Sequence, residues 1–381
     1  MRLMRAAFAW GVAGLCALFA LVSADLAASA EAVDLEIAVV GPMSGDFAGY
    51  GEQMRQGAQL AVEDINAKGG FGGRKVLLHV LDDEGDPKKA LAVAAKLKKQ
   101  GVRFVVGHYN SGASIPASDT YAKRNTLMVS PASTNPMLTE RKLWNVIRTS
   151  GRDDVQGTFA GEYIAQHLSE RKVAIVSDGT PYGQGLAVNA SKALKAAKKP
   201  AKLSTEVKYN QTKFSDLVAR MKKSGIEVVF FAGLGDQFGA LIRQASEAGL
   251  KMQFVSGDGS MVRGLPEIAG SGIEGTMILF SPDDRDNPAA KDVVARFRSR
   301  GFEPADYTLK TYAAVQVIAE GAKRGGLNAP RAVASAIKTG APIPTVVGDL
   351  TFDSKGDRRE RDIAIYVWTK GAAGYTLELM K

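Results

Sequence analysis

Four short loops carry the side chains best suited to bind a small polar molecule. Each loop follows a short apolar segment with the composition of a strand, at residues 106–112, 130–135, 177–183 and 256–260. In a parallel sheet flanked by helices, the loops at the carboxyl ends of the strands present backbone amides and helix N-termini to ligands. We therefore expect these loops to carry the binding groups.

The first two loops offer hydrogen-bond donors that suit an anion. Ser111 and Thr134 place hydroxyl groups beside backbone N–H groups, a combination that fits a carboxylate. Serine and threonine in such loops also cap helices, and for either loop alone helix capping is the simpler interpretation.

The other two loops offer different chemistry. Asp258 stands between two glycines with little predicted side-chain cover, so its carboxylate is free to meet a cation, and Tyr182 lies in a tight turn from which it can cap a pocket. A simple Asp-Gly turn is the alternative interpretation.

Most motifs of enzymes and cofactor sites are absent from the sequence. It contains no GxxxxGK[ST] loop, no HExxH and no GxSxG. Segment 233–239 has Phe238 where the dinucleotide fingerprint needs its third glycine. The acidic cluster at residues 82–86 lacks the alternation of an EF-hand loop. We therefore predict no cofactor and no metal.

The N-terminus has the pattern of an export signal. Arg2 and Arg5 precede an uncharged, mostly apolar run over residues 6–22, and Ala-Ser-Ala at residues 28–30 gives a cleavage pattern. The run is short of the roughly 20 residues that span a membrane. Removal of residues 1–30 also removes Cys16, the one cysteine, so the exported protein would have no disulfide and no thiolate site.

The chain is basic, with a formal net charge of +9 over its 381 residues. Its lysines come in short clusters, such as those at 96–99 and 195–199, on predicted helices with apolar residues between them at helical spacing. This pattern is typical of solvated helix faces. Because no basic stripe alternates with stacking aromatic residues, we predict no nucleic-acid partner.

The elements that position the four loops alternate along the chain. Short apolar segments and longer amphipathic segments follow one another from Leu35 onward, which predicts an α/β protein with parallel sheets flanked by helices. Two series of about 120 residues each match two lobes rather than one large sheet. The predicted strands lie at 35–40, 75–81, 102–106 and 127–129 in the first series, and at 173–177, 203–207, 228–231 and 254–256 in the second.

The last hundred residues have too few strands for a third sheet. We expect its strands, at 349–352 and 363–368, to complete the first two lobes, so that the chain crosses between lobes near residues 152, 281 and 358. The first lobe would then comprise 31–152 and 281–357, and the second 153–280 and 358–381. Asp153 is the predicted N-cap of a helix ending near Leu168.

Several motifs, taken in order, carry a family resemblance. The chain resembles the type I periplasmic binding proteins of the leucine/isoleucine/valine group, which are solute receptors of ABC importers. The resemblance covers essentially the whole chain after residue 30. It implies two Rossmann-like lobes joined by three crossovers, which close over an amino acid without catalysing a reaction, and a monomer that docks on a membrane permease. The motifs are AVVGPMSG at 38–45, DINAKGG at 64–70, SPASTNP at 130–136, YGQGL at 182–186 and TYAAVQ at 311–316.

The resemblance also assigns roles to loop residues. It implies that Ser111 and Thr134 hold the ligand carboxylate, and that the Ala132 carbonyl and Asp258 hold the ammonium group. Ser133, in the same loop, is included among the ligand-binding residues. At the position of Asp258 the branched-chain receptors carry a glutamate, whose arm is longer.

Aromatic residues complete the site that the resemblance implies. Tyr182 matches the tyrosine of the second lobe that closes the ammonium cage, and Tyr50 and Tyr307 match aromatic positions of the side-chain pocket. Leu234 falls where an aromatic residue is often found. Tyr109 is bulkier than the aliphatic residue expected in a leucine receptor.

Donors on one lobe and a carboxylate on the other favour a zwitterion, because only a zwitterion engages both lobes at once. Closure then depends on the ligand. We hypothesise that Tyr109 narrows the pocket and favours small or medium amino acids, such as alanine, valine, proline or a short ω-amino acid. A receptor for aromatic acids or amides is one alternative. A secreted hydrolase using Ser111 and His108 is another, although no orienting acid is apparent.

Overall fold

The computed structural model describes residues 34–380, except residues 72, 263, 328, 362 and 373. The predicted export signal at residues 1–30 lies outside the described residues. Among the helices of the described part of the chain, none is long and apolar enough to cross a membrane.

The first lobe is built on a parallel sheet of five strands in the order β2-β1-β3-β4-β5. Its helices include two from the C-terminal part of the chain, α12 and α13, which pack on α2, β3 and β4. The strands are β1 (Leu35–Gly41), β2 (Val76–Asp82), β3 (Phe104–Gly107), β4 (Leu127–Ser130) and β5 (Val146–Arg148), and the helices are α2 (Ala48–Ala67), α3 (Pro87–Lys99), α4 (Ser111–Lys123), α5 (Met137–Glu140), α12 (Thr308–Gly325) and α13 (Pro330–Thr339).

The second lobe is built on a sheet of seven strands in the order β14-β13-β10-β9-β8-β6-β7. Five of its strands are parallel, whereas β13 runs antiparallel to β10 and forms a hairpin with β14. The strands are β6 (Val173–Ser177), β7 (Leu203–Glu206), β8 (Val228–Ala232), β9 (Gln253–Ser256), β10 (Met277–Phe280), β13 (Ala364–Gly371) and β14 (Gly374–Leu379), and the α-helices are α6 (Asp153–His167), α7 (Pro181–Ala196), α8 (Ser215–Ser224), α9 (Gly235–Glu247) and α10 (Leu265–Ala269).

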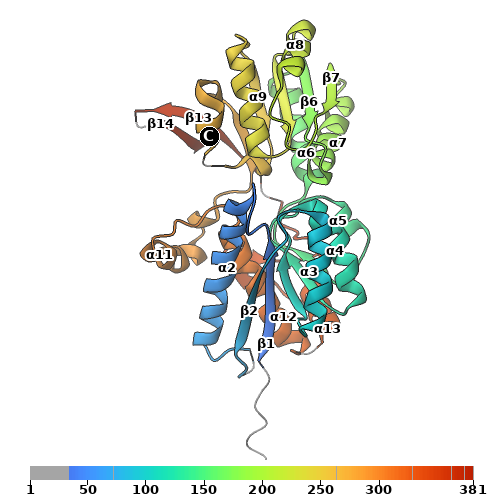
Figure 1. Ribbon diagram of the computed structural model, residues 1–381, viewed down its shortest axis with the longest axis vertical. Coiled ribbons are helices and arrows are strands. Elements are labelled where there is room, and N and C mark those ends of the chain that lie inside the picture. Colours follow the sequence, from blue (N-terminus) through green and yellow to red (C-terminus); the bar gives the residue numbers. More distant parts are fainter. Residues whose placement is uncertain are drawn as a thin grey trace, which may run out of the picture.

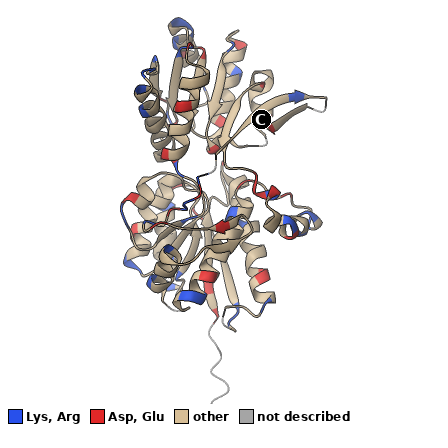
Figure 2. Cartoon of the chain, turned by 180° about the vertical axis from the view of Figure 1, so that it is seen from behind, with Lys and Arg blue, Asp and Glu red and all other residues tan. Residues whose placement is uncertain are grey.

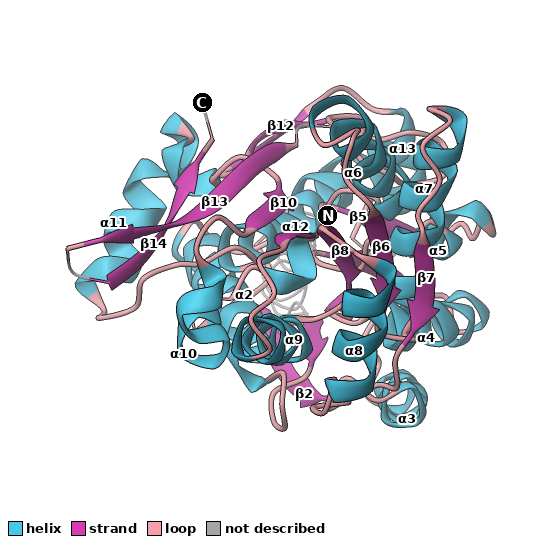
Figure 3. Cartoon of the chain, turned by 90° about the horizontal axis from the view of Figure 1, so that it is seen from above, coloured by secondary structure: helices cyan, strands magenta, loops and turns pink. Residues whose placement is uncertain are grey.

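The two lobes lie one above the other and meet at a narrow waist (Figure 1). Viewed from above, helices lie on both sides of the strands, and the β13–β14 hairpin extends beyond them (Figure 3). Helix α11 (Lys291–Ser299) lies beside the first lobe. Lys and Arg residues intermix with Asp and Glu over both lobes (Figure 2), as solvated helix faces require.

The α/β fold class predicted from the sequence is confirmed, with some elements misplaced. The strand predicted at 349–352 is β12 (Gly348–Leu350), which pairs only with β11 (Ile343–Thr345) in a separate ribbon and completes neither main sheet. The strands β5 and β10 were not predicted because segments of three or four residues between turns carry little periodicity.

The predicted N-cap of α6 is also wrong by one residue. Arg152 has extended backbone angles, φ −127° and ψ 143°, and occupies the N-cap position, while Asp153 is the first helical residue. The side chain of Asp153 is fully buried instead of capping the helix at its surface.

A buried ion pair ties two of the chain's passages between the sheets together. Arg148 ends β5, just before the first passage, and Asp357 precedes the return to β13. The Arg148 guanidinium is completely buried and donates to the Asp357 carboxylate at 2.6 Å. Thr139 donates to the same carboxylate at 2.9 Å, and Arg152 pairs with it from the partly exposed side. The hinge segments are thus bound to one another by charge.

Replacing Asp357 by alanine should destabilise the protein by about 3–5 kcal/mol, because Arg148 would be left as a buried charge without its partner. The matched control is Asp119→Ala, which removes the partly exposed partner of Arg141 and should cost about 1 kcal/mol or less. Urea unfolding of the two variants measures both changes. Equal losses of free energy of unfolding in the two variants would show that burial of the hinge pair does not increase the cost of removing its carboxylate.

Candidate ligand-binding site

A cavity of about 160 Å³ lies between the lobes, where the loops of both sheets face each other. It brings together eight of the ten residues predicted from the sequence to bind a ligand. These eight are Tyr109, Ser111, Ala132, Thr134, Tyr182, Leu234, Asp258 and Tyr307.

The two loops of the first lobe are fastened to each other through one carbonyl group. The carbonyl oxygen of His108 accepts hydrogen bonds from the hydroxyls of Ser130, Ser133 and Ser114, at 3.0, 3.2 and 3.3 Å. The Ser133 hydroxyl also lies 2.8 Å from the carbonyl oxygen of Tyr109. Ser133 therefore holds the loops together, and it is not among the residues that line the cavity.

Ser111 and Thr134 stand side by side on these fastened loops. Ser111 is the first residue of α4, and its hydroxyl accepts a hydrogen bond from the backbone N–H of Asn135 at 3.3 Å. Since the N-terminus of a helix carries a partial positive charge, the α4 terminus and the two hydroxyls together suit an anion. This end of the cavity has the chemistry of a carboxylate site.

Asp258 provides the opposite charge from the second lobe. Its side chain is almost fully buried, and its two carboxylate oxygens accept hydrogen bonds from Tyr182 and Tyr307, each at 3.0 Å. Burial raises the pKa of Asp258, while the two tyrosine hydroxyls act in the opposite direction. The carboxylate is thus held at the cavity wall by donors from both lobes.

Neither glycine beside Asp258 has room for a side chain. A Cβ atom on Gly257 would lie 2.7 Å from Leu186 and 2.9 Å from the Tyr182 hydroxyl, with Gln156 closer still, and one on Gly259 would lie 2.7 Å from the Tyr182 ring. The expectation that the glycines leave Asp258 without side-chain cover is therefore wrong. They leave room for a tyrosine that covers it.

Three tyrosines form a packed cluster at the other wall. The Tyr50 and Tyr109 rings stack with centroids 4.4 Å apart, and Tyr307 meets Tyr109 edge-on at 5.1 Å. Tyr50 lies behind Tyr109 and, with Leu234, lines a neighbouring cavity of about 280 Å³. Its hydroxyl donates to the carbonyl of Gly259 in the second lobe, at 3.4 Å. Tyr50 therefore supports the wall of the smaller cavity from behind.

The geometry argues against a Ser111–His108 hydrolytic pair. An acid that the sequence did not reveal, Asp83, lies 2.5 Å from Nδ1 of His108, but Nε2 of the same ring faces the Tyr121 hydroxyl at 3.0 Å. Both ring nitrogens are occupied by these two residues, and all three side chains are buried. His108 thus anchors the loop instead of activating a serine.

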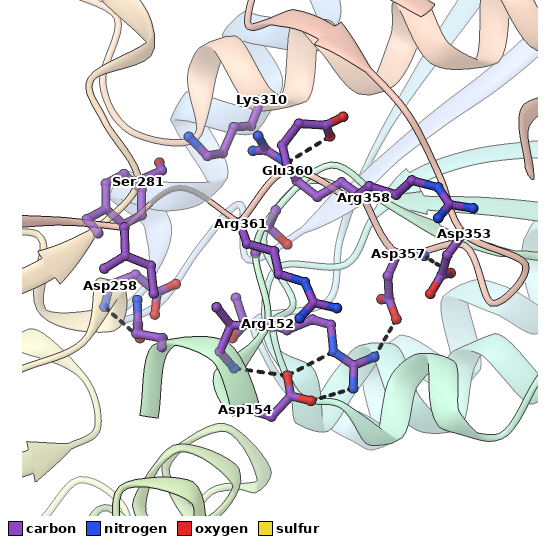
Figure 4. Close-up of a pocket in the computed structure, with 18 of the residues that line it drawn as sticks. Arg152, Asp154, Asp258, Ser281, Lys310, Asp353, Asp357, Arg358, Glu360 and Arg361 are labelled. Carbon is purple, nitrogen blue, oxygen red and sulfur yellow. Dashed lines mark hydrogen bonds and ion pairs between the residues drawn. The ribbon is translucent and has the colours of Figure 1, made fainter. Parts of the chain in front are cut away.

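A second cavity of about 230 Å³ opens on the hinge side of the site (Figure 4). It shares Thr134, Asp258 and Tyr307 with the smaller cavity, and the passages between the lobes line the rest. Charged residues of both signs face it, including Arg152, which pairs with Asp154 at 2.7 Å. Sequence reasoning placed the hinge passages here without identifying these charges.

Asn135 is a further contact between the lobes that sequence reasoning missed. Its side-chain amide donates to the carbonyl of Pro181, at the start of α7, at 2.5 Å. Asn135 belongs to the motif at residues 130–136, and that motif was the one feature of the sequence that could have pointed to this contact.

Among the described residues, no group of three or more His, Cys, Asp or Glu side chains is placed to hold a metal.

Two lobes are joined by three passages, and hydroxyl groups of one lobe face a carboxylate of the other across one cavity, an arrangement that suits a receptor for a small polar solute. A family model described as periplasmic binding protein matches residues 34–373. The chain belongs to this family, and the leucine/isoleucine/valine group identified from its motifs is confirmed by its relatives.

Two curated relatives cover nearly the whole chain. A Leu/Ile/Val-binding protein homolog 1 from Brucella melitensis is 46% identical over 341 residues, covering 90% of this chain and 92% of the relative. An amino acid binding protein from Pseudomonas aeruginosa is 40% identical over 351 residues, covering 91% of this chain and 94% of the relative.

Solved structures share the fold at low sequence identity. A leucine binding protein from Thermotoga maritima matches with a TM-score of 0.84 at 23% identity, over 91% of this chain and 98% of that one. A solute binding protein from Rhodopseudomonas palustris, solved with benzoate, matches with a TM-score of 0.78 at 19% identity, over 91% and 96%.

Replacing Tyr307 by phenylalanine should lower the free energy of unfolding by about 1.5–3 kcal/mol at pH 7, the usual contribution of a hydrogen bond to a charged group. Because burial raises the folded-state pKa of Asp258, its ionisation costs stability as the pH rises, and Tyr307 offsets part of that cost. The difference in free energy of unfolding between Tyr307→Phe and the wild type should become smaller on acidification, as Asp258 becomes protonated.

Urea unfolding at pH 7 and pH 4 measures this change. The control is Tyr163→Phe, since the Tyr163 hydroxyl donates an exposed, long hydrogen bond to the sulfur of Met380, at 3.8 Å, and its removal should have little effect at either pH. A deficit for Tyr307→Phe that is the same at both pH values would contradict the assigned contact with an ionised Asp258.

Proposed function

We propose that the protein is the solute receptor of an ABC importer and binds an amino acid in the cavity between its lobes. One observation carries the proposal: the hydroxyls of Ser111 and Thr134 and the carboxylate of Asp258 line the same cavity of about 160 Å³. A molecule with a carboxylate and an ammonium group on the same carbon atom, as in an α-amino acid, satisfies both ends.

The proposal includes where and with what the receptor works. It is exported to the periplasm by the signal at residues 1–30, acts as a monomer and delivers its ligand to a membrane permease. Residues 31–152 with 281–357 form the lobe that holds the ligand carboxylate. Residues 153–280 with 358–381 form the lobe that closes over it. No catalytic step is part of this function.

The roles within the site follow from the chemistry of each group. Ser111 and Thr134 donate to the ligand carboxylate, and Asp258 with the Ala132 carbonyl accepts from the ammonium. Each hydrogen bond to a charged group contributes about 1.5–3 kcal/mol. Several such bonds suffice for the roughly 8 kcal/mol of a micromolar complex once association costs are met.

The tyrosine cluster favours a small or medium aliphatic or branched side chain. Tyr109 lines the cavity and is held in place by the stacked ring of Tyr50 and the edge of Tyr307. A ring fixed on two sides does not move aside easily, because packed interiors resist rearrangement. The side chain of the ligand must therefore fit the space that remains in front of Tyr109.

Aromatic acids form the second candidate class of ligand. The cavity wall of Tyr109, Tyr182 and Tyr307 suits an aromatic ring, and the similarly folded Rhodopseudomonas protein was solved with benzoate. A benzoate, however, has no ammonium group to offset the buried charge of Asp258. Dependence on Asp258 distinguishes the two classes.

Thermal unfolding in the presence of the twenty amino acids, γ-aminobutyrate and benzoates should show stabilisation by small zwitterions. A ligand at 100 times its Kd adds about 2.7 kcal/mol, which corresponds to a shift of a few degrees. Asp258→Asn should abolish the shift, whereas Asp236→Asn, an exposed aspartate of the neighbouring cavity, should preserve it. Stabilisation by benzoates alone would replace the amino-acid class by the aromatic one.

Replacing Tyr109 by alanine should change the preference among amino acids. The vacated ring volume admits larger side chains, so the affinity for leucine relative to alanine should rise at least about tenfold, or 1.4 kcal/mol. Calorimetric titration with both amino acids measures this ratio, and Tyr163→Ala is the matched control outside the cavity. An unchanged ratio would show that Tyr109 does not set the size limit.

A further inference from the structure

One buried acid near the site has no hydrogen-bond partner. Asp153, the first residue of α6, is completely buried, and neither of its carboxyl oxygens has a partner. Buried polar groups without partners are rare in folded proteins, and an ionised carboxyl in such a place is strongly destabilising.

Asp153 lies directly behind the proposed carboxylate site. Its backbone N–H donates to the carbonyl of Thr134 at 3.0 Å, and its carboxyl lies beside the Thr134 side chain without a well-formed hydrogen bond to it. On the other side it faces α7 of the second lobe, where a Cβ atom on Gly185 would lie 3.2 Å from Oδ2 of Asp153. The carboxyl is thus enclosed between the two lobes, beside a residue that we assign to ligand binding.

The charges around Asp153 oppose its ionisation. Asp258 and Asp154 add negative charge, and Tyr182 faces it as a neutral phenol. Asp154 is itself paired with Arg152. Burial and the Asp258 carboxylate together raise the pKa of Asp153 well above its ordinary value.

Three features favour ionisation of Asp153, and together they do not match the opposing ones. The Thr134 side chain beside the carboxyl group favours its charged form. The N-terminus of α6 attracts a negative charge, but only weakly. The guanidinium of Arg148 is the nearby cation, and it already donates to the Asp357 carboxylate, to the Thr139 hydroxyl and to the carbonyls of Ser133 and Asn135. Its charge is therefore largely committed to the hinge.

We propose that Asp153 is a positioning residue which, as a neutral acid, donates a hydrogen bond to the Thr134 hydroxyl, so that this hydroxyl in turn donates to the carboxylate of the ligand. The inference rests on the proposed function and deepens it. A threonine hydroxyl has one proton and accepts others. The group to which the Thr134 hydroxyl donates its proton therefore depends on whether the carboxyl of Asp153 donates a hydrogen bond to that hydroxyl or accepts one from it.

Ionised Asp153 would work against binding in two ways. It would accept the single Thr134 proton and leave only lone pairs toward the ligand, and its charge would repel the ligand carboxylate. Conversely, a bound carboxylate favours the protonated form of Asp153. Binding should therefore take up a proton where Asp153 titrates, and affinity should fall as the pH rises through that range.

The test is the pH dependence of L-valine binding, measured by isothermal titration calorimetry between pH 6 and pH 9. For the wild-type receptor, Kd should rise at least tenfold over this range, with proton uptake seen as a difference between phosphate and Tris buffers. Asp153→Asn keeps the shape and a donor but cannot ionise. It should bind within threefold of wild type at pH 6, without the rise in Kd and without proton uptake.

Two further variants complete the design. Asp153→Ala removes the donor and should weaken binding at least tenfold at pH 6, and Asp119→Asn, whose partly exposed carboxylate pairs with Arg141 away from the site, should follow wild type throughout. A melting curve of each free protein shows that it is folded.

An Asp153→Asn variant that is folded but keeps the wild-type pH dependence, or binds more than tenfold more weakly at pH 6, would overturn the inference and leave the proposed function intact. A wild-type receptor that binds no amino acid at any pH would overturn the proposed function itself, and the inference with it.

Discussion

The carboxylate of Asp258, buried between the lobes, is the constraint on which the rest of the site depends. An ionised carboxyl is stable in such a place only when donors or cations surround it. Here Tyr182 supplies a donor from the second lobe and Tyr307 supplies one from the first. The surroundings meet that need: Gly259 makes room for Tyr182, and the packed tyrosine cluster fixes Tyr307. Such a group accepts a ligand cation readily, because the cost of burying the charge has already been met in part.

The hinge is ordered by ion pairs. Three passages of chain join the two lobes, and they have few apolar side chains that could hold them in place by packing. Arg148 and Asp357 bind two passages together inside the first lobe, and Arg152 extends the same network to its surface. Because such pairs depend on geometry, they hold one arrangement of the passages more than they add net stability.

The sequence predicts most of this architecture, because parallel strands deliver their C-terminal loops to one edge of a sheet. Ser111, Thr134 and Asp258 each follow a strand within a few residues, and all three reach the cavity. Side-chain direction within a loop is a different matter, since it is decided by partners distant in sequence. Ser133 turns to the carbonyl of Tyr109, and His108 turns to Asp83, 25 positions before it. Spacing alone carries no information on such contacts.

The two buried aspartates at the cleft illustrate how environment assigns different tasks to one side chain. Asp258 has a tyrosine hydroxyl on each oxygen and serves as an anion facing the cavity, whereas Asp153 has no partner on either oxygen and lies behind the cavity wall. Each ionised carboxylate raises the cost of ionising the other. If only one of the pair carries a charge, the tyrosine hydroxyls stabilise the ionised form of Asp258, and Asp153 stays protonated and can donate a hydrogen bond. A zwitterion then meets an anion where its ammonium group lies and a donor where its carboxylate lies, which is the charge pattern opposite to its own.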